Sequence, residues 1–379
     1  MNTQKLLLNI DEFTFTILPQ QKIDINIWDP YAESIIYNFV QSSHVDKVFA
    51  GEVTEMESAK LEGYSRSFNM GLKDYYFAMA YNPYQPTMGV CVRFSAKAWA
   101  IYQVRYKNLY DDIIHLPKFL HMVSDNCSES VRLSRVDMTV DYFDYDIILK
   151  DIYDKLMQEK LLVQDNKGRN RIRIIEFQGK NNQFETIYIG SRGTNSRGFL
   201  RIYDKRIEQI ETNGFRNAEA LACSSWIRFE AVFKGKYAHA IAEEFLKYNM
   251  DTNDLKKYIA QMIGQKYRFY DTTKNEYEIY TRDLLEVSEG NNFASLRVES
   301  PRDNALYQSI NHIKHGSGLF PTLYKIRELY GKDAEKEFLE YLFKEYKNGK
   351  WMGRTMYKEL TLWLKKHEDL KECKLSDNY

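Results

Sequence analysis

Three short segments of the chain alternate charged and apolar residues with the two-residue period of a β-strand. They are SRVDMTVDYF at 134–143, FLRIYDK at 199–205 and WIRFEAVF at 226–233. Their β-branched and aromatic residues favour strands over helices, although residues four apart would also share one side of a helix. Each strand then has one apolar face to bury and one charged face. We therefore predict an antiparallel sheet whose apolar face packs on helices.

Sorting the side chains by this period shows which residues share the charged faces. The members are Asp137, Thr139 and Asp141 in the first segment, Phe199, Arg201, Tyr203 and Lys205 in the second, and Trp226, Arg228 and Glu230 in the third. If the three strands are neighbours in one sheet, these faces bring acids, basic residues and one tyrosine onto a single surface. Such an assembly is unusual for a purely structural surface.

The chemistry of these residue types indicates a reaction at a phosphate. Carboxylate oxygens suit Mg²⁺ or Mn²⁺, so Asp137, Asp141 and Glu230 are the predicted metal ligands. Arginine binds phosphate oxygens in pairs. Tyr203 would be the nucleophile, and because a free phenol has a pKa of about 10, we expect Arg201, Lys205 or the metal to favour its phenolate.

Structural explanations for the same residues stay open at this point. The chain has 29 tyrosines, most of which must serve packing. Two acids on one strand face are also typical of a solvated surface, and Arg228 and Glu230 can pair with neighbours across a sheet. Spacing alone does not decide between these explanations and a catalytic cluster.

The rest of the chain predicts an α+β protein, with a largely antiparallel sheet at its core, flanking helices and a mostly helical C-terminal region. We divide it into an N-terminal α/β part at 1–125, a catalytic sheet at 126–260 and a helical region at 261–379. The first helix is predicted to begin near Pro30, with Asp29 as its N-cap.

Composition limits the class of protein. With 53 basic and 53 acidic residues the formal net charge is zero, which argues against a general polycation but permits a local basic groove. No apolar run approaches the roughly 20 residues of a membrane span, and the opening residues are not typical of a signal peptide. We expect a cytoplasmic protein. The four cysteines are far apart and indicate neither a zinc site nor a disulfide framework.

The ordered blocks SRVDMTVD, ETIYIGSRGTNSRGFLRIYDKRIE and WIRFEAVFK resemble the replication initiation factors of the Rep_trans family. These proteins are rolling-circle initiators of Gram-positive plasmids and the related DNA relaxases of conjugative elements. The resemblance covers roughly residues 8–260. The chain lacks the His-hydrophobic-His motif of the HUH endonucleases, so carboxylates would have to hold the metal.

The resemblance implies that the chain nicks one DNA strand at an origin. The family's tyrosine falls on Tyr203, its R-x-D-x-x-x-D strand on Arg135, Asp137 and Asp141, and its R-x-E strand on Arg228 and Glu230. Attack of Tyr203 on a phosphodiester would leave a 5′-phosphotyrosyl link and a free 3′-OH. Asp11 and Glu185 are further candidates for metal ligands.

The DNA contacts and partners are expected around this site. We predict that Arg228 and the loop residues Ser191, Arg192 and Arg197 contact the DNA backbone. The basic and aromatic helices of the C-terminal region are candidates for origin recognition or for dimer contacts. We expect origin DNA with a single-stranded segment, a second copy of the chain and a replicative helicase as partners.

Two alternatives are weighed against this interpretation. One is an origin-binding regulator that keeps the fold without the cleavage. The other is a tyrosine recombinase or topoisomerase, whose pocket is rich in Arg and His and needs no metal.

Overall fold

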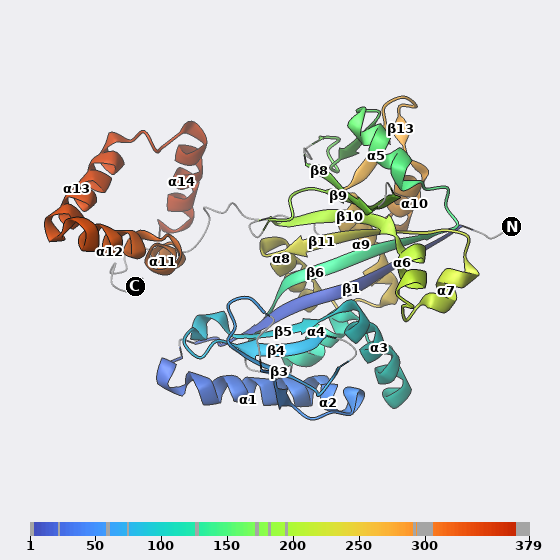
Figure 1. Cartoon of the computed structure of the whole chain (residues 1–379), viewed down its shortest axis with the longest axis horizontal. Helices are drawn as coiled ribbons and strands as arrows, with labels where there is room; N and C mark the ends of the chain where they lie inside the picture. The colour runs from blue at the N-terminus through green and yellow to red at the C-terminus, as the bar shows by residue number, and fades with distance from the viewer. Residues whose placement is uncertain are drawn as a thin grey trace. The chain divides into compact units, whose positions relative to one another are not determined.

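The computed structural model has a large antiparallel sheet flanked by helices (Figure 1). It describes residues 4–21, 23–57, 61–73, 76–125, 129–170, 174–180, 183–193, 196–290, 293 and 306–368. The chain forms two compact units, Met1–Arg297 and Val298–Tyr379. The predicted α+β class is confirmed. The functional division at residues 125 and 260 stays a prediction.

Ten strands of the described chain form the main sheet, in the order β2-β3-β4-β5-β1-β6-β11-β10-β9-β8. Their bounds are β1 Lys5–Leu18, β2 Thr54–Glu55, β3 Arg66–Asn69, β4 Phe77–Tyr81, β5 Val90–Phe94, β6 Ser130–Phe143, β8 Ile175–Lys180, β9 Gln183–Ile189, β10 Gly198–Asp204 and β11 Trp226–Lys234. A small second sheet consists of β7 Leu161–Gln164, β12 Arg268–Asp271 and β13 Glu276–Tyr277. The three segments with alternating faces are β6, β11 and β10, and they are adjacent in the main sheet.

The helices of the first unit lie around this sheet. They are α1 Ile25–Ser43, α2 Val45–Phe49, α3 Ala96–Tyr110, α4 Leu116–Asp125, α5 Leu149–Met157, α6 Lys205–Glu211, α7 Asn217–Ala222, α8 Lys236–Lys247, α9 Thr252–Gly264 and α10 Ile279–Val287, with a 3₁₀ turn at Pro86–Met88. Helices α8 and α9 pack on β6 and lie behind the central strands in Figure 1. They cover the apolar face, which leaves the opposite face of the central strands for the charged residues.

The apolar face of β11 shows why the central strands are fixed in place. Ile227, Phe229, Ala231 and Phe233 alternate along it and are buried. The Phe229 ring lies 5.5 Å from the Phe269 ring and 5.3 Å from the Tyr280 ring, measured between centroids. Burial of side chains of this size stabilises the fold by about 1.5–3 kcal/mol each, so the register of β11 is strongly specified.

Helix α1 begins five residues before the predicted start. Its N-cap is Asp24, whose side chain accepts a hydrogen bond from the Asn26 N–H, and Pro30 lies inside the helix. The prediction of Asp29 as the cap was therefore wrong. The earlier start buries Trp28, whose Nε1 donates a 2.8 Å hydrogen bond to the Asn82 carbonyl, and this tertiary contact decides where the helix begins.

The cap gives a testable stability difference. Asp24→Ala leaves a first-turn N–H unpaired and should lower the free energy of unfolding by about 1 kcal/mol. Asp24→Asn keeps a capping oxygen and should lower the free energy of unfolding by only a few tenths of a kcal/mol. Urea unfolding of the two variants measures the difference, and an equal loss in both would contradict the assignment of Asp24 as the cap.

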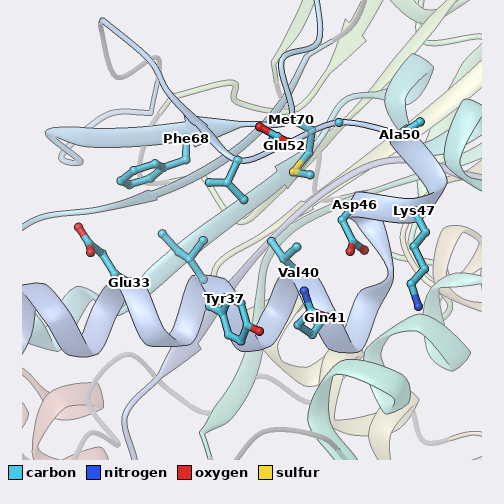
Figure 2. A pocket seen from close by; sticks show the side chains of 13 residues that line it. Glu33, Tyr37, Val40, Gln41, Asp46, Lys47, Ala50, Glu52, Phe68 and Met70 are labelled. Atoms are coloured by element: carbon cyan, nitrogen blue, oxygen red, sulfur yellow. The ribbon is translucent and has the colours of Figure 1, made fainter.

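An apolar groove of about 730 Å³ lies between α1, α2 and β3. In Figure 2, Tyr37 and Val40 of α1 lie across the groove from Phe68 and Met70. Glu33, Asp46 and Glu52 place carboxylates around it. None of the predicted site residues lines this groove.

The described helices of the second unit are α11 Leu306–Asn311, α12 Leu319–Tyr330, α13 Lys332–Asn348 and α14 Arg354–Lys366, with a π-helical turn at His312–Gly316. Helix α12 packs against α13, and neither buries a side chain fully. Both expose large apolar side chains, namely Phe320, Tyr324, Leu329, Tyr330, Tyr341, Phe343 and Tyr346. A role in origin recognition or in dimer contacts stays a prediction for this region. No helix in the described ranges has the length and apolar character needed to cross a membrane.

Candidate active site on the charged face of the sheet

The strand register brings the predicted site residues of three strands into rows. Asp141 of β6 lies opposite Arg228 of β11, and Arg228 lies opposite Tyr203 of β10. In the next row, Glu230 lies between Thr139 of β6 and Arg201 of β10. Side chains opposite one another in antiparallel strands are about 5 Å apart at their Cβ atoms. The strand pairing therefore places Tyr203, Arg201, Arg228 and Glu230 next to one another.

Tyr203 sits in this site with its hydroxyl on a carboxylate. It is 8% exposed, and its Oη donates a hydrogen bond of 3.2 Å to Oε2 of Glu230. The guanidinium carbon of Arg201 lies 4.8 Å from the centre of its ring, and Nζ of Lys205 lies 5.7 Å from it. The hydroxyl therefore has a proton acceptor and nearby cations.

The pKa of Tyr203 moves in the direction opposite to the expectation. Burial, followed by the negative charge of Glu230, raises this pKa well above its ordinary value, and the opposing effects of Arg228 and Arg201 are smaller. The arginines act on this pKa in the expected direction, but burial of the phenol and the charge of Glu230 outweigh them. The phenol stays protonated at neutral pH, so an attack by Tyr203 needs a base.

Glu230 is positioned to act on Tyr203. Only 2% of it is exposed, and Nη2 of Arg201 donates to both of its carboxylate oxygens, at 2.7 and 2.6 Å. Nε of Arg201 is buried and has no hydrogen-bond partner among the described residues. A buried guanidinium N–H without an acceptor is costly, and next to Tyr203 it suits the oxygen of a bound phosphate.

Asp141 and Arg228 form the centre of a buried ion-pair network. Nε and Nη2 of Arg228 donate to the two Asp141 oxygens, at 2.6 and 2.9 Å. Nη1 of Arg228 lies 3.1 Å from Oδ1 of Asp11, and Nη1 of Arg216 lies 3.0 Å from Oδ2 of Asp141. Burial acts to raise the pKa of Asp141, but Arg228, together with the smaller effects of Trp226 and Arg216, holds that pKa below its ordinary value. A direct contact of Arg228 with DNA would need one of these pairs to open.

Asp137 belongs to a second network at the other end of the same face. Nε and Nη2 of Arg135 donate to its two oxygens, at 2.8 and 2.6 Å. Glu12 joins this network, with its Oε1 3.2 Å from Nη1 of Arg135 and 2.8 Å from Nη2 of Arg93. Burial raises the pKa of Asp137 to about 7, against the opposing effect of Arg135.

The three predicted metal ligands do not converge in this arrangement. Asp137 and Asp141 are four residues apart along β6, about 13 Å, and Glu230 lies opposite Thr139 between them. No group of three or more His, Cys, Asp or Glu side chains in the described part of the chain is arranged to hold a metal ion. Each of the three carboxylates instead binds an arginine. This donor set does not fit a Mg²⁺ site, and the assignment of the three as ligands stays a prediction.

The further metal candidates do not complete such a group. Asp11 reaches the same face, where it pairs with Arg228. The Glu185 side chain lies outside the described residues.

The remaining predicted residues lie at the ends of β10. Lys205, at the start of α6, is 7% exposed and pairs with Glu208 at 2.6 Å. Arg192 is exposed on the loop, bonds Glu176 at 2.9 Å and lies over the Tyr188 ring at 4.2 Å. Ser191, also exposed, accepts from the Gly193 N–H at 3.3 Å. Arg197 lies at the opposite end of β10 from Tyr203, 6.0 Å from the Tyr237 ring.

A cleft of about 750 Å³ opens beside Tyr203 and Arg201. Its walls come from the segment before α5, the start of α5, β9, β11 and α6. They include Ile147, Lys150, Thr186, Ile207 and Glu208. The tyrosine is therefore reached from a hollow large enough for part of a polymer.

Sequence reasoning missed Arg216 and Glu12, both of which bind predicted site residues. Arg216 lies next to a six-residue helix in a stretch without an alternating pattern, so nothing placed it on the charged face. Glu12 lies within an irregularity of the β1 register, between Ile10 and Phe13, which a two-residue period cannot anticipate.

The chain is similar to known proteins in both its sequence and its fold. The sequence model of a family described as replication initiation factor (Rep_trans) matches residues 131–342, which is more than half of the chain. No curated protein matches the chain. Among solved structures, the fold is similar to that of a rolling circle replication initiator protein from Geobacillus stearothermophilus. The TM-score is 0.48 at 14% sequence identity, over 75% of this chain and 97% of that chain.

Proposed function

Because the chain belongs to the replication initiation factor family (Rep_trans), we propose that it nicks and rejoins one DNA strand at a replication or transfer origin. The nick initiates rolling-circle replication of a plasmid or conjugative element. Tyr203 is the nucleophile. The observation that carries this assignment is the 3.2 Å hydrogen bond from the Tyr203 hydroxyl to Glu230, at the edge of an open cleft.

The proton of the phenol has a defined destination. As the Tyr203 oxygen forms its bond to phosphorus, its proton passes to the carboxylate of Glu230. The bond from phosphorus to the 3′ oxygen breaks, and that oxygen takes up a proton from water, which Glu230 replaces by releasing the proton that it took from Tyr203. The products are a 5′-phosphotyrosyl link and a free 3′-OH. The reverse reaction rejoins the strand, because the tyrosyl ester keeps the energy of the phosphodiester.

Arg201 links the nucleophile and the phosphate. It holds Glu230 through Nη2, and its unpaired Nε is the group we assign to a non-bridging oxygen of the scissile phosphate. A guanidinium fixed before the reaction stabilises the negative charge of the pentacovalent transition state. Lys205 adds a second cation near the Tyr203 ring. Arg228 acts in this proposal by fixing β11 to β6.

A divalent cation, Mg²⁺ or Mn²⁺, is the cofactor we expect from the family resemblance. When bound, such an ion would polarise a phosphate oxygen. Arginines hold Asp137, Asp141 and Glu230 in this structure, so no chemical step is assigned to the ion.

The proposal and the metal requirement can be tested together. The purified protein with Mg²⁺ or Mn²⁺ is expected to nick supercoiled DNA that carries its origin and to remain covalently attached to the product. Excess EDTA should reduce nicking to background, and added Mg²⁺ should restore it. Sustained nicking in EDTA would contradict the metal requirement and favour a recombinase-like or topoisomerase-like pocket. Origin binding without any nick would instead favour the non-catalytic regulator.

Origin DNA with a single-stranded segment is the proposed substrate. We also propose a second copy of the chain and a replicative helicase as partners. Size-exclusion chromatography with light scattering would test the dimer.

A further inference from the structure

Three cations near the end of the sheet where β10 begins and β11 ends have no carboxylate partner among the described residues. Arg197, Lys234 and Lys266, which we call the basic rim, are each only partly exposed. The arginines of the charged face differ from these cations, because Arg135, Arg201 and Arg228 each bind an acid. A partly buried cation that is not paired with a carboxylate is costly.

Backbone and ring contacts hold the rim together. The Lys234 N–H donates a 2.9 Å hydrogen bond to the Arg197 carbonyl. Nζ of Lys234 lies 5.3 Å from the centre of the Phe199 ring, and Nζ of Lys266 lies 3.4 Å from the centre of the Tyr237 ring. Because Tyr237 also lies beneath Arg197 at 6.0 Å, two of the cations share one ring. These cation–π contacts orient the charges without neutralising them.

The electrostatics of the rim indicate a place for an anion. Burial, together with the nearby charge of Arg197, lowers the pKa of Lys266 to about 7. Burial and Arg135 lower the pKa of Lys234, and the charge of Asp137 opposes them only in part. Both effects would be relieved by a bound anion, because a negative charge between the cations favours their protonated forms.

Lys234 lies on the same face of the sheet as the nucleophile, whereas Lys266 follows α9 and lies 5.8 Å from the centre of the Phe233 ring, on the other face. Phe199, whose ring lies beneath the Lys234 amine, shares a face of β10 with Arg201 and Tyr203. Four residues of strand separate Phe199 from Tyr203, about 13 Å. Successive nucleotides of a B-form strand rise by about 3.4 Å along the helix axis, so a few nucleotides would span this distance.

We propose that the basic rim binds the phosphate backbone of the DNA strand that Tyr203 cleaves, a few nucleotides from the scissile phosphate. Lys234 and Lys266 are the new contacts. Lys234 extends the DNA path along the face of β10 that carries Tyr203, and Lys266 continues it around the end of the sheet. Cations set on aromatic rings are typical of single-strand binding. The inference rests on the proposed function for the identity of its ligand.

Salt-dependent binding tests the rim separately from the chemistry. The probes are a short fluorescein-labelled DNA single strand and its duplex, titrated by fluorescence anisotropy at several salt concentrations. For the single strand, the plot of log K, the logarithm of the binding constant, against log salt has a negative slope. In Lys234→Gln/Lys266→Gln its magnitude should decrease by about 1.4, or about 0.7 for each lost phosphate contact. The control is the double variant Lys107→Gln/Lys257→Gln. Both lysines are exposed, on α3 and α9, so the variant removes the same charge and should leave the slope unchanged.

Each outcome decides the question. An unchanged slope in the folded glutamine variant overturns the proposal that the basic rim binds DNA, even if the wild type nicks its origin. A slope that falls equally on the duplex overturns the single-strand assignment. A slope that falls only on the single strand, and recovers in Lys234→Arg/Lys266→Arg, supports the rim even if the wild type fails to nick, in which case the proposed function fails alone.

Discussion

Tyr203→Phe is expected to lower the rate of nicking by about 1,000-fold or more and to abolish the covalent adduct. The substitution removes only the attacking oxygen. The ring keeps its contacts with Arg201 and Lys205, and the lost hydrogen bond to Glu230 costs about 1 kcal/mol of stability. The measurement is the fraction of labelled origin DNA that is cleaved, and the fraction that migrates with protein, on a denaturing gel.

Tyr188→Phe is the matched control for this variant. Tyr188 lies on β9 directly opposite Arg201, and its hydroxyl makes a 3.3 Å hydrogen bond with Gln178. It thus shares the sheet and the neighbouring arginine with Tyr203 but has no carboxylate partner in the described part of the chain. Nicking by this variant should stay within a few-fold of wild type. If Tyr203→Phe nicks as well as wild type, the nucleophile is a different residue.

The alternation of β6, β10 and β11 was sufficient to predict which side chains share a face. A two-residue period has a single consequence for the pleat, and the apolar residues of all three strands demand burial on the other side. The adjacency of the strands was conditional in the sequence and is confirmed by the sheet order. The residue pattern assigned Tyr203 and Glu230 to the charged faces of their own strands, and the sheet order joins those faces into one surface.

The pairing within that surface could not be predicted in the same way. Which acid meets which arginine depends on register, and register depends on contacts that are distant in sequence. Arg216 reaches Asp141 from a segment 75 residues away, and Glu12 reaches Arg135 from within an irregularity of β1. These pairings are the reason that the acids hold arginines in place of forming a metal group.

The direction of the Tyr203 pKa was missed for a related reason. Counting nearby cations predicts a lowered pKa, but burial of the phenol and the charge of Glu230 act the other way and are larger. Burial is a property of the assembled sheet and is absent from a one-dimensional pattern. The start of α1 was misjudged similarly, since burial of Trp28 outweighed the local signal of Pro30.

Arg228→Met is expected to lower the free energy of unfolding by about 3–5 kcal/mol. Arg228 is 2% exposed and pairs with Asp141, which is fully buried, and with Asp11. Methionine preserves much of the volume of the side chain, so the loss comes mainly from a buried carboxylate left with Arg216 alone. Urea unfolding followed by tryptophan fluorescence measures the change, and Trp226 lies beside this network.

Two further variants separate the buried charge from other causes. Arg192→Ala breaks an exposed pair with Glu176 and should cost less than about 1 kcal/mol. Arg228→Met combined with Asp141→Leu removes both charges and should recover most of the stability lost in the single variant, because no unpaired carboxylate then remains at that position. If the double variant is no more stable than Arg228→Met, lost packing, not the uncompensated charge, destabilises the sheet. If Arg228→Met unfolds at the same urea concentration as Arg192→Ala, the network does not hold β11 to β6, and the role given to Arg228 in fixing the site must be abandoned.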